Sequence, residues 1–233
     1  LGAALVLFTR RTHPLLMDAL LAFGAGVMLA SSYFSLLAPS IDMAQELGQL
    51  PWLVAAAGFL AGGALLLLAD HIMRHLPCAG KRRSILLVSS ITLHNIPEGL
   101  AVGLAFGAAS VSGEPGSMMA ALGLAIGMAI QNFPEGAIVS MPLKQSVKSR
   151  WKAFGYGVGS GIVEPLAGLV TILLIDLLQP VLPYLLAFAA GAMIYVVVEE
   201  LIPESQSGRH SNVATIGVAV GFALMMLLDV ALG

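Results

Sequence analysis

The chain has 233 residues, of which 58% are hydrophobic and only 10% are charged, and its formal net charge is −2. A soluble domain carries about 25% charged residues, so this composition excludes an ordinary water-soluble globule. The small net charge and the lack of a basic stripe give no sign of nucleic acid as a partner. Apolar runs of about 20 residues predict helices that cross a lipid bilayer, and the alternating ten-residue segments of a membrane β-barrel are missing.

Eight apolar segments follow one another, and we expect an all-α, polytopic bundle that forms one transmembrane domain over residues 1–233. Their predicted bounds are 1–8, 14–38, 51–73, 84–107, 118–142, 153–175, 183–203 and 212–232. The first is too short to span a bilayer, so we expect it to be a truncated helix with a further part of the chain before it. It does not resemble a signal peptide, because its charges follow the apolar stretch. The single cysteine, Cys78, cannot form an intramolecular disulfide.

The basic residues test this segmentation. All eleven Lys and Arg lie in alternate connections, at residues 10–11, 74–83, 144–152 and 209. The charged residues of the intervening connections are all acidic, namely Asp42, Glu46, Glu114 and Asp176. Because Lys and Arg mark the cytoplasmic side of a membrane protein, the pattern predicts that both termini of an eight-span chain lie outside the cytoplasm. A bacterial inner (plasma) membrane is the expected location.

Two consecutive segments carry one polar motif. Residues 94–99 read HNIPEG and residues 131–136 read QNFPEG. A motif shared by two helices that cross in opposite directions predicts an inverted repeat, which places a binding site near the bilayer midplane. The first polar residue of each motif lies about 15–20 Å into its span at 1.5 Å per residue. Pro97 and Pro134 lack an N–H, so we expect both helices to kink there.

A third glutamate, Glu164, precedes a proline near the centre of segment six, so it shares the depth of Glu98 and Glu135. Three buried carboxylates require a cation or protons to compensate them. His94 lies four residues before Glu98, so both occupy one helix face. Imidazole with carboxylate and amide oxygens suits a divalent ion such as Zn²⁺ better than Na⁺ or K⁺. The alternative, polar residues that only join helices, explains a single Asn or His better than a duplicated motif.

These residues resemble the ZIP (Zrt/Irt-like) divalent metal transporters, particularly the prokaryotic members, over all eight segments. The resemblance implies transport of Zn²⁺ or a related ion (Cd²⁺, Fe²⁺ or Mn²⁺) into the cytoplasm through a two-metal site, without a cofactor or an enzymatic reaction. The ligands that it implies are His94, Asn95, Glu98, Gln131, Asn132, Glu135 and Glu164. Many members have His where this chain has Gln131, so Zn²⁺ is the favoured ion and not an established one. A homodimer is left open.

Other polar residues are candidates for the pathway on either side of this site. Met28 shares a helix face with Ser31 and Ser35, which would line access from outside, although packing explains these residues equally well. Candidate exit ligands lie at the cytoplasmic ends of segments three and seven, namely Asp70, His71, His75, Glu199, Glu200 and Glu204. The alternative is that these charges only contact water. Asp18 and Asp229 are isolated acids for which the sequence predicts no partner.

The rival classes lack their motifs. An intramembrane metalloenzyme, such as a membrane protease, needs a His-Glu-x-x-His helix or an equivalent open zinc site, and the sequence has none. A metal sensor normally needs an extramembrane output domain, which this sequence does not contain. Glycine patterns at 58–62, 123–127 and 155–161 predict close packing between helices.

Overall fold

The computed structural model describes residues 1–8, 14–75, 82–113, 115–206 and 211–232. Within these ranges the side chains of residues 73–75, 82–91, 93, 94, 115, 131, 134, 135, 138, 139, 142, 145, 146, 179, 211 and 232 are not described. The described part of the chain is helical throughout and contains no β-strand. The all-α prediction is therefore confirmed.

The helical elements follow the predicted segments in order. They are η1 (Gly2–Ala4), α1 (Leu5–Phe8), α2 (Pro14–Ser31), η2 (Ser32–Leu37), α3 (Ala38–Glu46), α4 (Pro51–His75), α5 (Arg82–Ser112), α6 (Pro115–Val147), α7 (Arg150–Gly161), α8 (Val163–Leu173), α9 (Ile175–Leu178), η3 (Gln179–Val181), α10 (Leu182–Val196), η4 (Val197–Leu201), α11 (Ile202–Gln206) and α12 (Ser211–Leu232). Several are pieces of one rod: α2, η2 and α3 are continuous, as are α10, η4 and α11, and η2 and η4 are π-helical. The helix α5 is continuous through Pro97.

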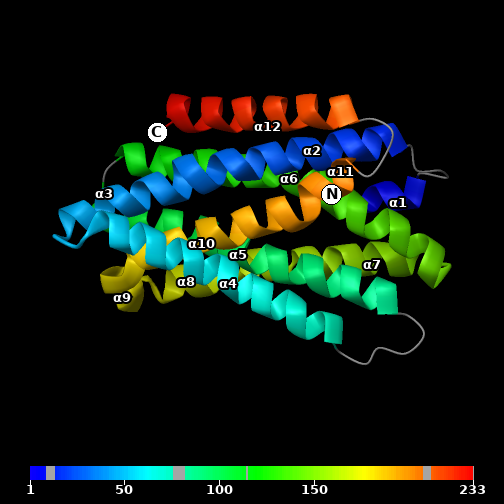
Figure 1. Ribbon diagram of the computed structural model, residues 1–233, viewed down its shortest axis with the longest axis horizontal. Helices are drawn as coiled ribbons and strands as arrows, with labels where there is room; N and C mark the ends of the chain where they lie inside the picture. The colour runs from blue at the N-terminus through cyan, green and yellow to red at the C-terminus, as the bar shows by residue number, and fades with distance from the viewer. Residues whose placement is uncertain (9–13, 76–81, 114, 207–210, 233) are drawn as a thin grey trace.

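Among the described residues, five helices are long and apolar enough to cross a membrane. They are Pro14–Glu46, Pro51–Ile72, Arg150–Leu173, Leu182–Gln206 and Asn212–Ala231. The helices α5 and α6, with 31 and 33 residues, lie among them in the same bundle (Figure 1). The chain is therefore an integral membrane protein.

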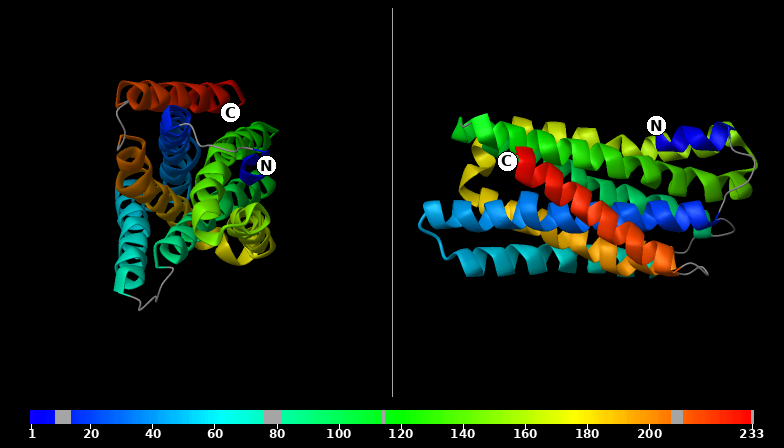
Figure 2. Two further views of the ribbon diagram at one scale, coloured as in Figure 1. Left: turned by 90° about the vertical axis from the view of Figure 1, so that its right-hand side faces the viewer. Right: turned by 90° about the horizontal axis from the view of Figure 1, so that it is seen from above.

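The helices form two groups, which are visible when the bundle is seen end-on (Figure 2, left). In the first, α5 and α6 pack against each other, and α7, α8 and the N-terminal η1 and α1 pack on them. In the second, α2 pairs with α12 and α4 pairs with α10. The groups meet where α2 and α12 lie on α6 and where α10 lies on α5. The motif-bearing helices therefore lie next to this contact.

The two ends of the bundle differ in charge. The end at which α6 finishes and α7 begins carries Lys144, Lys148, Arg150 and Lys152, and α4 ends and α5 begins at the same end (Figure 1). We call it the basic end, and the opposite end, with Asp42 and Asp176, the acidic end. At the basic end, Arg150 Nη1 donates a hydrogen bond to the Leu7 carbonyl at 3.1 Å, which ties α7 to α1.

Glycines bring α4 and α10 into backbone contact. A Cβ added at Gly62 would lie 2.0 Å from the Phe188 carbonyl oxygen, and one at Gly191 would lie 1.9 Å from that of Phe59. At Gly58 a Cβ would meet the Tyr184 carbonyl at 2.6 Å. The predicted role of the 58–62 pattern in close packing is confirmed.

The pair α2 and α12 uses the same device. A Cβ at Gly221 would lie 2.0 Å from the Phe23 carbonyl oxygen, and one at Gly26 would lie 2.1 Å from that of Val218. Both pairs therefore leave no room for a side chain at these crossings.

The glycine run at 155–161 packs at one position only. Gly157 faces Ala3 and Ser140, whereas a Cβ at Gly155, Gly159 or Gly161 would meet nothing within 4 Å. The prediction of close packing is wrong for these three glycines. Residues two apart point to different sides of a helix, so a spacing of two cannot place all four against a neighbour.

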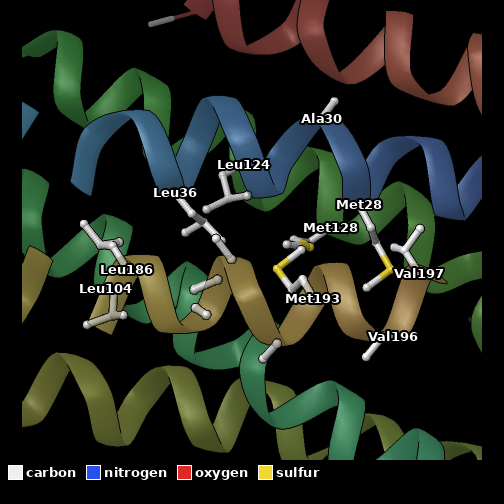
Figure 3. Close-up of a cluster of buried hydrophobic side chains, with 14 of the residues drawn as sticks. Met28, Ala30, Leu36, Leu104, Leu124, Met128, Leu186, Met193, Val196 and Val197 are labelled. Atoms are coloured by element: carbon white, nitrogen blue, oxygen red, sulfur yellow. The ribbon is translucent and has the colours of Figure 1, made fainter. Parts of the chain in front are cut away.

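The core lies between α2, α6 and α10, where Leu36, Leu124, Leu186 and three methionines meet (Figure 3). Met28 belongs to this core and is 2% exposed. The hydroxyls of Ser31 and Ser32 both donate to the Met28 carbonyl, at 3.1 and 2.6 Å. In this conformation Met28 packs in the core, and its place on a metal pathway stays a prediction.

Candidate metal site

Two predicted ligands on α5 are buried. Asn95 is 4% exposed and Glu98, one turn further along the helix, is 0% exposed. The Asn95 Nδ2 donates a hydrogen bond to the Ser160 carbonyl at 2.8 Å, which joins α5 to the last turn of α7. No donor among the described residues reaches the buried Asn95 Oδ1. The hydrogen bond therefore fixes the orientation of this amide and leaves its oxygen without a partner among the described residues.

The second pair joins α6 to α8. Asn132 Nδ2 donates a hydrogen bond to Glu164 Oε2. Glu164 lies in the first turn of α8, directly after the break at Ile162 that separates α7 from α8. Pro165 contributes to this break because it has no N–H for the helical ladder. A carboxylate in the first turn is also favoured by the partial positive charge of the helix N-terminus.

The glycine of each motif marks a close backbone approach. A Cβ at Gly99 would lie 2.1 Å from the Glu164 carbonyl oxygen, so α8 contacts α5 directly beside the candidate site. A Cβ at Gly136 would lie 2.8 Å from the Ala3 nitrogen, where η1 crosses α6. The glycines therefore set the distance between the helices that carry the polar residues.

One cavity of about 290 Å³ brings three predicted ligands together. Asn95, Asn132 and Glu164 line it, with Leu1, Gly136 and Ser160 among the other residues of its wall. Glu98 does not line it. The cavity is thus a pocket of mixed polar and apolar lining in the first helix group, built from η1 and from α5 to α8.

Three predicted ligands, His94, Gln131 and Glu135, have side chains that lie outside the described ones, although their backbones lie in α5 and α6. Among the described side chains, no three His, Cys, Asp or Glu lie close enough to hold a metal ion. That set of residue types does not include Asn and Gln, whose amide oxygens can also bind a metal. The described part of the site therefore consists of Asn95, Glu98, Asn132 and Glu164.

Comparison with known proteins identifies the family. The family model described as "ZIP Zinc transporter" matches residues 75–229, about two thirds of the chain, including both motifs and Glu164. The chain belongs to the ZIP zinc transporter family. It is 37% identical to Zinc transporter ZIP11 of Xenopus tropicalis, covering 100% of this chain and 93% of the relative. It is also 38% identical to Zinc transporter ZIPB of Bordetella bronchiseptica, with 100% and 77% covered. For Zinc transporter GufA of Myxococcus xanthus the identity is 35%, with 86% and 81% covered.

Membership of the ZIP family confirms the resemblance found in the sequence. The relatives come from eukaryotes as well as from bacteria, so the similarity extends beyond the prokaryotic members of the family. ZIP proteins are transporters, which removes the alternative of an intramembrane metalloenzyme.

The candidate exit residues of this ZIP protein all belong to helix ends at the basic end. Asp70 and His71 lie near the end of α4, Glu199 and Glu200 lie in η4, and Glu204 lies in α11. Asp70 and Glu200 are half-buried and the other three are exposed. The side chain of His75 lies outside the described ones. Binding of a metal by this group stays a prediction.

One polar contact was not predicted from the sequence. The Ser35 hydroxyl donates to Asp229 Oδ1 at 2.6 Å, which joins η2 to the end of α12. The two residues lie 194 positions apart. The available signal was that segments two and eight run in the same direction and carry these two residues near the same end.

Proposed function

We propose that this ZIP protein carries a divalent transition metal, Zn²⁺ foremost, across the membrane toward the cytoplasm. The observation that carries the proposal is the cavity in which Asn95, Asn132 and Glu164 meet. An oriented amide oxygen and a carboxylate in an otherwise apolar bundle provide oxygen ligands for a divalent cation. Buried ionisable groups at this depth are costly and are retained where they bind or conduct ions.

The complete site would contain two metal ions. His94 precedes Glu98 by four residues on α5, and Glu135 follows Asn132 by three on α6. At these spacings, side chains of one helix share a face. We place His94, Asn95 and Glu98 on one side of the site, Gln131, Asn132 and Glu135 on the other, and Glu164 between them, with Glu98 and Glu135 as bridging carboxylates.

Matching contacts at a constant offset favour the predicted inverted repeat and, with it, a midplane position of this site. On α2, Phe23 and Gly26 contact α12, and on α10 the residues 165 positions later, Phe188 and Gly191, contact α4 in the same way. The π-helical segments η2 and η4 begin at residues 32 and 197, again 165 positions apart. Repeats that run in opposite directions place their shared site near the midplane, and we infer that all eight rods belong to the transmembrane bundle.

The charges orient the protein. Lys144, Lys148, Arg150 and Lys152 lie at the basic end, and the positive-inside rule assigns that end to the cytoplasm. The last helix, α12, finishes at the acidic end, so we place the C-terminus outside the cytoplasm. Transport toward the cytoplasm therefore runs from the acidic end to the basic end.

Uptake of ⁶⁵Zn²⁺ into proteoliposomes tests the proposal. We expect saturable uptake by the unaltered protein and a loss of most of it in Glu98→Gln and Glu164→Gln, which keep side-chain size but remove a carboxylate. Asp176→Asn is the matched control, because Asp176 is an exposed carboxylate at the acidic end. Uptake that equals that of empty vesicles, or that survives both glutamate changes, would contradict the proposal.

A further inference from the structure

One carboxylate oxygen of Asp18, Oδ2, is buried and has no hydrogen-bond partner among the described residues. Asp18 lies in the second turn of α2 and is 8% exposed. Removing a carboxylate from water without a compensating partner costs several kcal/mol. An acid at such a position requires a compensating cation or proton, and no hydrogen-bonding partner for its buried oxygen lies among the described residues.

Asp18 faces the interior of the bundle. Residues at i, i+7 and i+14 follow one stripe of a helix, and Asp18 shares its stripe with Ala25 and Ser32, which are both buried. Met28, on the edge of this stripe, points from α2 toward α10 in the core (Figure 3). Asp18 lies ten residues closer to the basic end than Met28, or about 15 Å at 1.5 Å per residue. The face of α2 that packs against α6 and α10 therefore carries a carboxylate near its basic end.

Along the bundle axis, Asp18 lies at a depth between the α6 motif and the basic end. The helices α2 and α6 run in opposite directions, so that α2 begins and α6 ends at the basic end (Figure 1). Asp18 is four residues, or about 6 Å, from Pro14 along the helix axis. Gly136, the last residue of the α6 motif, is eleven residues from Val147, or about 16 Å. An ion that leaves the site toward the basic end therefore passes the depth of Asp18.

The charges around this part of α2 are acidic. The elements that pack on α2 are α12, α6, α10, η4 and α11. Of these, η4 brings Glu199 and Glu200, α11 brings Glu204, and the described acid of α12, Asp229, lies at its far end. The described cation on α6 is Lys144, in its last turn. Acids on the elements that pack on α2 favour a divalent cation on this side of the helix through charge attraction.

We propose that Asp18 is a transit ligand for the transported divalent cation. Asp18 receives the ion from the site between α5, α6 and α8 and passes it to the acidic side chains on the helix ends that lie at the basic end. This assignment rests on the transport function proposed above. The step exchanges one oxygen ligand for another, and the metal keeps its oxidation state. The carboxylate of Asp18 is the group that binds the ion during its passage.

Zinc uptake by Asp18→Asn tests the assignment, because Asn has the same shape and lacks the charge. We expect the maximal rate to fall at least tenfold, which corresponds to about 1.4 kcal/mol in the barrier. The KM for external Zn²⁺ should stay unchanged, since the ion is loaded from the acidic end. Asp18→Glu should retain most of the rate, and Asp176→Asn should equal the unaltered protein. The zinc content of purified Asp18→Asn should also be unchanged, because the site between α5, α6 and α8 is intact.

The reactivity of a thiol at position 18 reports directly whether the metal ion binds there. In a Cys78→Ser background, Asp18→Cys should react with a small methanethiosulfonate reagent during transport, and Zn²⁺ or Cd²⁺ should slow that reaction. If Asp18 only packs, Asp18→Asn will transport normally or unfold at a higher temperature, and metal will not protect the thiol. Either result overturns the assignment while leaving the transport function intact. Failure of the unaltered protein to take up zinc would instead refute the transport function itself.

Discussion

Gly99 is the position at which the smallest change should disturb the candidate site. A Cβ there would lie 2.1 Å from the Glu164 carbonyl oxygen, whereas ordinary van der Waals contact begins at 3.4 Å. Gly99→Ala therefore requires α5 and α8 to separate by about 1.3 Å at this level. Overpacking of this kind costs about 1–3 kcal/mol. Because the atom that is met is backbone, the shift moves Glu164 away from Asn132 on α6.

Thermal unfolding in detergent and zinc uptake measure the two consequences. We expect Gly99→Ala to lower the unfolding temperature and to reduce uptake by more than the loss of folded protein explains. The control is Gly159→Ala, another glycine-to-alanine change in a helix, at a position where a Cβ meets nothing within 4 Å. It should be neutral or slightly stabilising, because Ala favours helix by about 1 kcal/mol over Gly. If Gly99→Ala matches Gly159→Ala in both measurements, the contact between α5 and α8 does not set the site geometry.

Three further predictions concern polar groups. Asn95→Ala removes the hydrogen bond to the Ser160 carbonyl and should lower the free energy of unfolding by about 0.6–1.7 kcal/mol, the range for bonds between membrane helices; no change in chemical unfolding would contradict it. Ser35→Ala breaks the link to Asp229 and should destabilise the protein by a similar amount, while Asp229→Asn, which can still accept the bond, should cost less. Uptake should weaken as the pH falls through the carboxylate range, because protons compete with the metal for the glutamates, and a flat pH profile would count against carboxylate ligands.

The helices and the family were predictable from the sequence because membrane helices are set by local composition. The predicted apolar segments are helical where the structure describes them, although segment six is divided at Ile162, since a backbone buried in the membrane must satisfy its own hydrogen bonds within the helix. The duplicated motif predicted Asn95 and Asn132, and the glutamate before Pro165 predicted Glu164; the structure brings these three to one cavity. Spacing along a helix was sufficient for that step.

Contacts between distant helices were not predictable in the same way. A span that is apolar all round does not tell which side meets a neighbour, so the bond between Ser35 and Asp229 and the empty surroundings of Gly159 emerged only from the fold. The π-helical segments η2 and η4 also lack a sequence signal, because they replace the helical hydrogen-bond pattern without a proline or glycine at their centre. The helices α11 and α12, which pack on α2, follow Asp18 by almost 200 residues, so the surroundings of Asp18 could not be read from its neighbours in the sequence.

The central claim is that the cavity between α5, α6 and α8 binds the transported metal. Crystals of the protein soaked in Cd²⁺ or Zn²⁺ and measured at the absorption edge of the metal test it most directly. We expect an anomalous peak inside the bundle, with oxygen atoms of Glu164 and of Asn95 or Asn132 at about 2.0–2.6 Å, and loss of that peak in Glu164→Gln. Anomalous density confined to the helix ends, with the cavity empty at saturating metal, would contradict it.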